Sequence, residues 1–179
     1  MKGFITICFL LMLGSFQLAA QHVSPDSIKA QLIRDWERAK QYTAEYLAAM
    51  PAEHYSTKPI AGIRSFAEQM LHTAQGTIGL SANGTGKNRI YAGYNMERSA
   101  TAQSKDSVTY YVNTSYDFAI EGIKSMDPNK LGEAVKRGNF TESRLSWIMK
   151  AFEHQTHHRG QCTIYIRMQG LTPPTEKLF

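Results

Sequence analysis

The sequence predicts an all-α protein built as a four-helix bundle. Four long segments carry apolar residues at helical spacing and end at residues that favour helix termini. No segment shows the sustained alternation of a half-buried strand, and there is no internal repeat. Helices of this length bury their apolar sides most simply against one another, which favours an up-down bundle.

Residues 1–20 are expected to lie outside this fold. Lys2 gives a positively charged start, an unbroken apolar run extends from Phe4 to Leu13, and Leu18-Ala19-Ala20 offers a small-residue cleavage site. This pattern is typical of a secretory signal peptide, because the apolar run is too short to span a bilayer. We therefore expect residues 21–179 to form a single exported domain, periplasmic or extracellular; an uncleaved N-terminal anchor is the alternative.

Charge and cysteine content exclude several classes of protein. The formal net charge of the full chain is +5, and loss of Lys2 with the signal peptide lowers it by one. Because no dense Lys/Arg run is present, nucleic-acid binding is not expected. The mature chain keeps only Cys162, so it can form no intramolecular disulfide. It contains no second apolar run, so we expect no stable membrane insertion after signal removal.

The first two helices have clear start signals. One is expected from Ser24, as N-cap with Pro25 behind it, to about Ala49, and Met50-Pro51 ends it. The next opens with the capping box Ser65-Phe66-Ala67-Glu68 and should continue to about Leu80. A Gly/Asn-rich loop over residues 83–88 then begins a long connection to the third helix.

The last two helices complete the bundle. The third is expected over about residues 104–126, closing before Asp127-Pro128. The linker at residues 131–139 has room for a short extended piece. The fourth helix is expected from Thr141 to about Gln169, and Gly170 is a natural stop after it.

The fourth helix carries an inward seam that polar residues interrupt. The seam consists of Trp147, Ala151, His154, His158, Gln161, Tyr165 and Met168, spaced alternately four and three apart. His154 and His158 are one turn apart, so their rings share a face and can hold one ion. Buried imidazoles need polar partners, and a metal is one such partner. Water or neighbouring side chains in a partly open cleft are the alternative.

Three further residues are harder to place. His157 points about a quarter-turn from the seam and is expected to be a supporting or surface residue. Gly160 costs about 1 kcal/mol in mid-helix, which indicates close approach of a backbone or ligand, or simple tolerance. His72 shares a polar face with Glu68 and Gln75, opposite an apolar side. That spacing by itself would leave His72 in solvent.

Two segments together resemble a known family. Residues 65–72, Ser-Phe-Ala-Glu-Gln-Met-Leu-His, and residues 154–161, His-Gln-Thr-His-His-Arg-Gly-Gln, are similar to the DinB/YfiT-like family of metal-binding bundles. Lys58-Pro59 and the tail at residues 165–174 extend the similarity to about residues 50–174. The resemblance implies that a divalent metal is held by His72, His154 and His158, and it overrides the solvated assignment of His72. It also implies that the polar seam of the second helix faces that of the fourth, and that the protein forms a homodimer.

Three neutral imidazoles leave coordination positions open, as in a catalytic metal site. The ligands do not fix the ion, and zinc, nickel, iron and manganese all remain candidates. Glu68 is a candidate to accept a hydrogen bond from a metal ligand or to act as a general base, and Gln161 could orient a water or a ligand. We expect an exported metal-dependent enzyme that hydrolyses a small molecule. A thiol-dependent S-transferase and a non-catalytic scaffold or dimer module are the alternatives.

Overall fold

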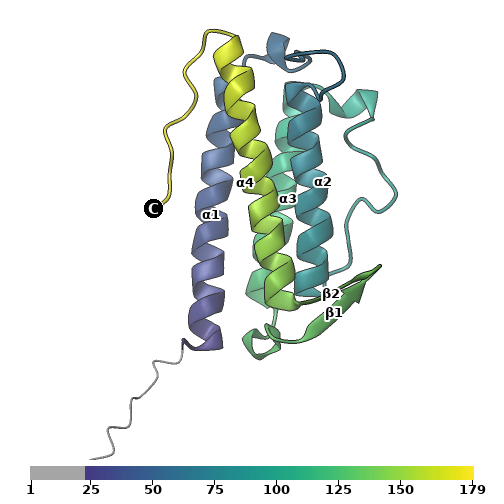
Figure 1. The fold of residues 1–179 in the computed structure, drawn as a ribbon, viewed down its shortest axis with the longest axis vertical. Helices are drawn as coiled ribbons and strands as arrows, with labels where there is room; N and C mark the ends of the chain where they lie inside the picture. Colours follow the sequence, from purple (N-terminus) through teal and green to yellow (C-terminus); the bar gives the residue numbers. More distant parts are fainter. Residues whose placement is uncertain (1–22) are drawn as a thin grey trace, which may run out of the picture.

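A computed structural model describes residues 23–179, so the expected signal peptide lies outside the described residues. The helices of the bundle are α1 (Pro25–Ala49), α2 (Phe66–Thr85), α3 (Lys105–Ser125) and α4 (Arg144–Met168). They lie side by side along one axis, with a two-stranded hairpin at one end (Figure 1). The predicted all-α bundle and its long connection between the second and third helices are confirmed.

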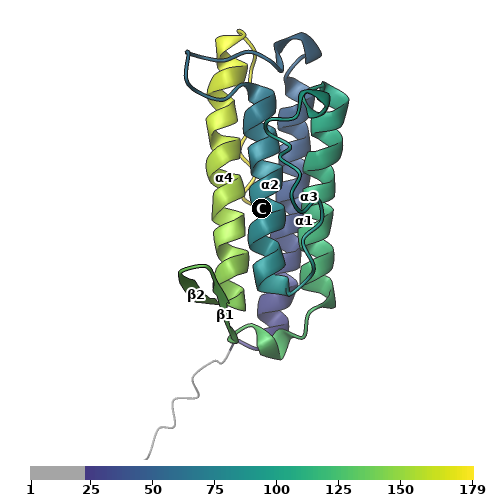
Figure 2. The same ribbon diagram turned by 90° about the vertical axis from the view of Figure 1, so that its right-hand side faces the viewer.

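The helices do not alternate strictly in direction. Lys29 near the start of α1 donates to the Met126 carbonyl oxygen at 2.7 Å, so α1 and α3 run antiparallel. The end of α2 meets the start of α4, where Gly84 lies against Arg144, so these two are also antiparallel. The ends of α2 and α3 meet where Thr85 lies against Gly122, so α2 and α3 run parallel. Residues 86–104 therefore return along the length of the bundle (Figures 1 and 2).

The helix termini follow from the sequence at most positions. The Ser24 side chain accepts from the Ser27 amide at 3.1 Å, and Ser65 and Glu68 form the predicted capping box. Beyond α4, Gly170 adopts a left-handed conformation with φ of 72°, as expected for a glycine stop.

Two predicted boundaries were wrong. Helix α2 continues past Leu80 through the Gly/Asn-rich segment to Thr85 and ends at Gly86, which has φ of 77°. Close packing of Gly84 against α4 outweighs the low helix propensity of this segment. Helix α4 begins at Arg144 rather than Thr141, because the preceding residues form a β-strand.

That strand belongs to a hairpin in the linker where an extended piece was expected. Strand β1 (Ala134–Arg137) pairs antiparallel with β2 (Phe140–Ser143). The two-residue turn between them contains Gly138 with φ of 58°, which favours glycine. The Trp147 indole donates to the Val135 carbonyl oxygen at 3.1 Å and so joins the hairpin to α4.

The core is centred on aromatic side chains from three helices. Trp36 of α1 is fully buried and makes edge-to-face contacts with Tyr116 of α3 and Phe152 of α4, with ring centroids 5.8 and 5.5 Å apart. Such pairs add to the free energy gained by burying their area. Within residues 23–179, no helix has the length and apolarity needed to cross a membrane.

Two glycines of α2 test how tightly α2 and α4 pack. A Cβ at position 84 would lie 2.6 Å from Ile148 Cγ1 and 2.8 Å from the Arg144 carbonyl oxygen, whereas at position 79 the nearest atom is 3.8 Å away. We expect Gly84→Ala to lower the free energy of unfolding by about 1–3 kcal/mol through overpacking. Gly79→Ala should raise it by about 0.5–1 kcal/mol through helix propensity. Urea denaturation measures both, and equal effects would contradict this packing.

Candidate metal centre

Three histidines from two helices converge between α2 and α4. His72 comes from α2, and His154 and His158 come from adjacent turns of α4. One nitrogen from each ring lies within 4.8 Å of the others, and the Nε2 atoms of His72 and His154 are 3.4 Å apart. The structure therefore brings together the three predicted ligands.

A glycine makes room for one of these rings. Gly76 lies one turn after His72 on α2, and a Cβ at this position would collide with the His154 imidazole. The His154 ring therefore fills space that the side chain of any other residue would occupy. The absence of a side chain at position 76 lets α4 place His154 beside His72.

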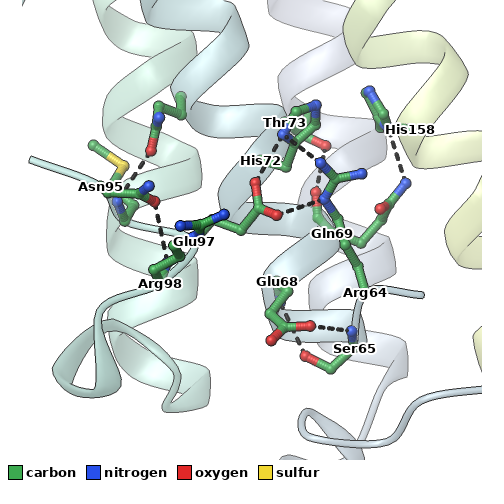
Figure 3. Close-up of polar contacts among 12 residues, drawn as sticks. Arg64, Ser65, Glu68, Gln69, His72, Thr73, Asn95, Glu97, Arg98 and His158 are labelled. Carbon is green, nitrogen blue, oxygen red and sulfur yellow. Dashed lines mark hydrogen bonds and ion pairs between the residues drawn. The ribbon is translucent and has the colours of Figure 1, made fainter. Parts of the chain in front are cut away.

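A charged pair orients His72. Its Nδ1 lies 2.9 Å from the Glu97 carboxylate, which comes from the connection between α2 and α3 (Figure 3). The other carboxylate oxygen accepts from Arg64 Nε at 2.7 Å. Burial opposes ionisation of Glu97, but hydrogen bonds from Arg64 and His72 hold the pKa of its carboxyl below the usual value. An ionised acceptor on Nδ1 turns the free Nε2 of His72 towards the other histidines.

The backbone around Glu97 is tied to the bundle. The Met96 amide donates to the Gln75 side chain on α2 at 3.0 Å, and Met96 itself is buried. The Gln103 side chain donates to the Glu97 carbonyl oxygen at 2.9 Å. Because these contacts flank Glu97, its carboxylate is held at a defined position beside His72.

Two glutamine side chains contact Nδ1 of His158. The buried side-chain amide of Gln69 on α2 lies 2.8 Å from His158 Nδ1 (Figure 3). Gln161 Oε1 lies 3.3 Å from the same nitrogen and also contacts the Gln69 amide. A histidine that binds metal through Nε2 carries hydrogen on Nδ1, which the amide oxygen of Gln161 can accept, while Gln69 Nε2 donates to that same oxygen.

The environment keeps two of the imidazoles neutral. Burial, followed by the proximity of His72, lowers the pKa of His154 to about 4. Burial, followed by the proximity of His154, lowers that of His158 to about 4 as well. Both rings therefore keep a free nitrogen lone pair at neutral pH, which is the form that binds metal ions.

These features fit a divalent ion. Two nitrogens bound about 2.0–2.1 Å from one tetrahedral zinc lie about 3.4 Å apart, which matches the separation between His72 and His154 Nε2. Among residues 23–179 the buried Nδ1 of His154 has no hydrogen-bond partner, so this ring is held in place by its packing against Gly76. His72, His154 and His158 would hold the ion, and Glu97 and Gln161 would orient two of them.

Other predicted residues lie elsewhere. The Glu68 carboxylate accepts from the Ser65 amide at 2.6 Å and pairs with Lys58 Nζ at 2.9 Å, so it caps α2, and Glu97 takes the expected place beside His72. Burial opposes the effect, but the hydrogen bond from the Ser65 backbone and the contacts with Lys58 leave the pKa of Glu68 below its usual value. Its role as a general base stays a prediction.

The polar seam of α2 faces α4 only in part. His72 faces α4. The Gln75 side chain instead accepts from the Met96 amide, so the connection between α2 and α3 covers the Gln75 side of α2. His157 is exposed, and its Nε2 accepts from Gln161 Nε2 at 3.0 Å, in keeping with the expected surface position. No described protein atom lies within 4 Å of a Cβ built at Gly160, so this glycine admits no neighbouring backbone.

A cavity opens beside the histidines. It has a volume of about 610 Å³, and its polar lining includes Arg64, Gln69, Glu97 and Gln161. Pro59, Ile63, Ile164 and Tyr165 form its apolar lining. The histidines themselves do not line it, but Gln69, Glu97 and Gln161 each contact one of them. The cavity therefore adjoins the centre through the residues that orient its ligands.

Sequence reasoning missed Arg64, Gln69 and Glu97. Gln69 interrupts the apolar run that begins α2, and a polar residue on an inward stripe was a usable signal. Glu97 lies in a connection without periodicity, so no local pattern could assign it to His72.

Comparisons with known proteins agree with this fold. A DinB family model matches residues 21–178. A DinB-like protein from Bacillus cereus is 19% identical, with a TM-score of 0.71 over 83% of this chain and 97% of its own. A DinB-like protein from Bacillus subtilis is 18% identical, with a TM-score of 0.65 over 83% of this chain and 96% of its own. No curated protein matches the chain significantly. The match along almost the whole of residues 23–179 establishes that the chain belongs to the DinB family.

Proposed function

We propose that this protein is an exported, metal-dependent enzyme that acts on a small molecule, most simply by hydrolysis. The observation that carries the proposal is the convergence of three histidine nitrogens within 4.8 Å, beside a cavity lined by residues that contact them. Export rests on the signal-peptide pattern of residues 1–20. Zinc, nickel, iron and manganese are the candidate ions.

An ion held by three imidazoles would polarise a substrate oxygen and lower the pKa of a bound water. The surrounding residues would orient the histidine ligands and the substrate. Glu97 and Gln161 each place an oxygen beside Nδ1, of His72 and His158 respectively, and so orient these rings. Gln161 lines the cavity and reaches His158, so its amide is placed to hydrogen-bond a substrate there.

The dimensions of the cavity limit the substrate. A volume of about 610 Å³ suits a small molecule. Its apolar lining would cover a hydrocarbon portion, and the amides and charged groups would receive a polar portion. Arg64 is already paired with Glu97. It therefore holds the Glu97 carboxylate in place more than it offers a free positive charge to the substrate.

Replacing a ligand tests the metal site directly. We expect His154→Ala and His72→Ala to weaken Zn²⁺ and Ni²⁺ binding by at least about 100-fold, because two imidazoles remain where three converge. Isothermal titration of chelator-treated protein measures this loss. His157→Ala is the matched control, since it removes a neighbouring, exposed imidazole outside the cluster. Equal loss in the control, or a wild-type protein with no affinity for either ion, would rule out this site.

Glu97→Gln tests the orienting carboxylate. The amide keeps the size of the side chain but removes the charge that holds His72 Nδ1, so Zn²⁺ affinity should fall about 10–100-fold. Glu53→Gln changes an exposed carboxylate on another segment and should leave the affinity unchanged. If the two variants bind Zn²⁺ alike, Glu97 does not orient the site.

Turnover separates an enzyme from a scaffold. Metal-loaded protein should hydrolyse at least one member of a panel of small esters, amides and lactones, and His154→Ala should abolish that activity. Gln161→Ala should lower turnover by about 10-fold, because it removes an amide that lines the cavity and contacts His158. No turnover, together with a steep fall in melting temperature on metal removal, would instead indicate a structural metal. Turnover only with added thiol would favour an S-transferase.

A further inference from the structure

A second cavity lies on the other side of α4 from the histidines. It has a volume of about 510 Å³ and is lined by residues of α1, α4 and the C-terminal segment. That segment runs back beside α1 after α4 ends (Figure 1). It is fastened there by buried Pro173, by a 2.5 Å hydrogen bond from Arg38 Nη1 to the Lys177 carbonyl oxygen, and by the ion pair of Lys177 with Glu45.

The cavity contains a buried guanidinium without an anion. Arg159 is only 6% exposed, and within residues 23–179 no carboxylate oxygen lies within 4.0 Å of it. Its Nη1 donates to Thr43 at 3.2 Å and to Gln155 at 2.7 Å, and its Cζ lies 4.5 Å from the Tyr42 ring centroid. Neutral partners compensate a buried charge only partly.

The remaining donors of Arg159 are available to a ligand. Its Nε and Nη2 have no hydrogen-bond partner among the described residues, and neither is among the atoms sealed from solvent without a partner. Arg159 lines the cavity, and these two groups are the donors it has left for a ligand there. The two groups present parallel N–H bonds, a geometry that matches the two oxygens of a carboxylate.

Gly160 leaves the adjacent space open. It lines the same cavity in the middle of α4, where glycine costs about 1 kcal/mol relative to alanine. A Cβ built at this position would have no atom of another described segment within 4 Å. Close packing therefore does not explain the glycine. Gly160 follows the histidine motif directly after Arg159. Because it has no side chain, the cavity beside Arg159 is larger.

The other walls suit a ligand with an apolar body and an acidic group. Tyr42 and Tyr46 contribute aromatic surface and Pro174 an aliphatic ring, while Arg167 adds a second positive charge. Burial raises the pKa of Tyr42 to about 12, so its hydroxyl stays neutral. Glu176 is the acidic residue of the lining; it is exposed and would repel an anionic ligand.

We propose that this cavity is a binding site for a small organic carboxylate, anchored on Nε and Nη2 of Arg159 with its apolar body against Tyr42, Tyr46 and Pro174. The site is separate from the metal centre, because Arg159 faces α1 whereas His158 faces α2. It does not depend on metal binding or on the proposed hydrolysis.

Benzoate binding to metal-free protein tests this site without interference from carboxylate ligation to a metal. Isothermal titration should show saturable binding, and benzylamine, which has a similar ring and the opposite charge, should not bind. Gly160→Leu should weaken benzoate binding by at least about ten-fold by filling the cavity, while the open space around position 160 leaves the fold intact. Arg159→Gln should weaken it as much, and Glu176→Gln should strengthen it about two- to five-fold.

Arg98→Gln is the matched control, because Arg98 lines a cavity on the histidine side and should leave benzoate affinity unchanged. Zn²⁺ affinity should be preserved in Gly160→Leu, which shows that the metal centre is intact. Failure of the wild-type protein to bind benzoate up to about 50 mM would overturn the proposal. So would unchanged affinity in Gly160→Leu, or equal binding of benzylamine.

Discussion

The His154 imidazole lies against α2 at Gly76, in the space where another residue would carry a side chain. This contact sets the distance between α2 and α4 and therefore the separation of His72 from the pair on α4. A second glycine, Gly84, lets the far end of α2 approach the first turn of α4 equally closely. A metal site needs donor atoms placed to within a fraction of an ångström, and two close contacts along one helix pair provide that constraint.

The same close packing determines the charge state of the site. Protonation of His154 and His158 is disfavoured in this partly buried space, because burial and the neighbouring imidazoles both oppose positive charge. The pKa values of His154 and His158 are lowered accordingly. The Nε2 atoms of His72 and His154 lie 3.4 Å apart. A cation bound between the three rings would be held by neutral imidazoles, which is the physical argument for a metal over a solvated histidine cluster.

Local signals predicted much of the fold but only part of the site. The caps at Ser24 and Ser65 and the stop at Gly170 act over a few residues, so they could be recognised directly. The end of α2 could not be recognised, because the close packing of Gly84 against α4 joins segments that are far apart in the sequence. His154 and His158 followed from spacing, whereas His72 needed the family resemblance. Glu97 and Gln69 act through contacts between distant segments, which periodicity does not encode.

The order of the helices explains how Glu97 reaches the site. Because α2 and α3 run parallel, the chain must return along the bundle, a distance of about 30 Å for a helix the length of α2. The returning segment covers the polar side of α2, where Gln75 holds the Met96 amide. Glu97, the next residue, then meets His72 and Arg64. A bundle with strictly alternating helices could join α2 to α3 by a short turn at one end, and no chain would pass His72. The long connection is therefore part of the site, since it supplies the carboxylate that orients one of the three histidines.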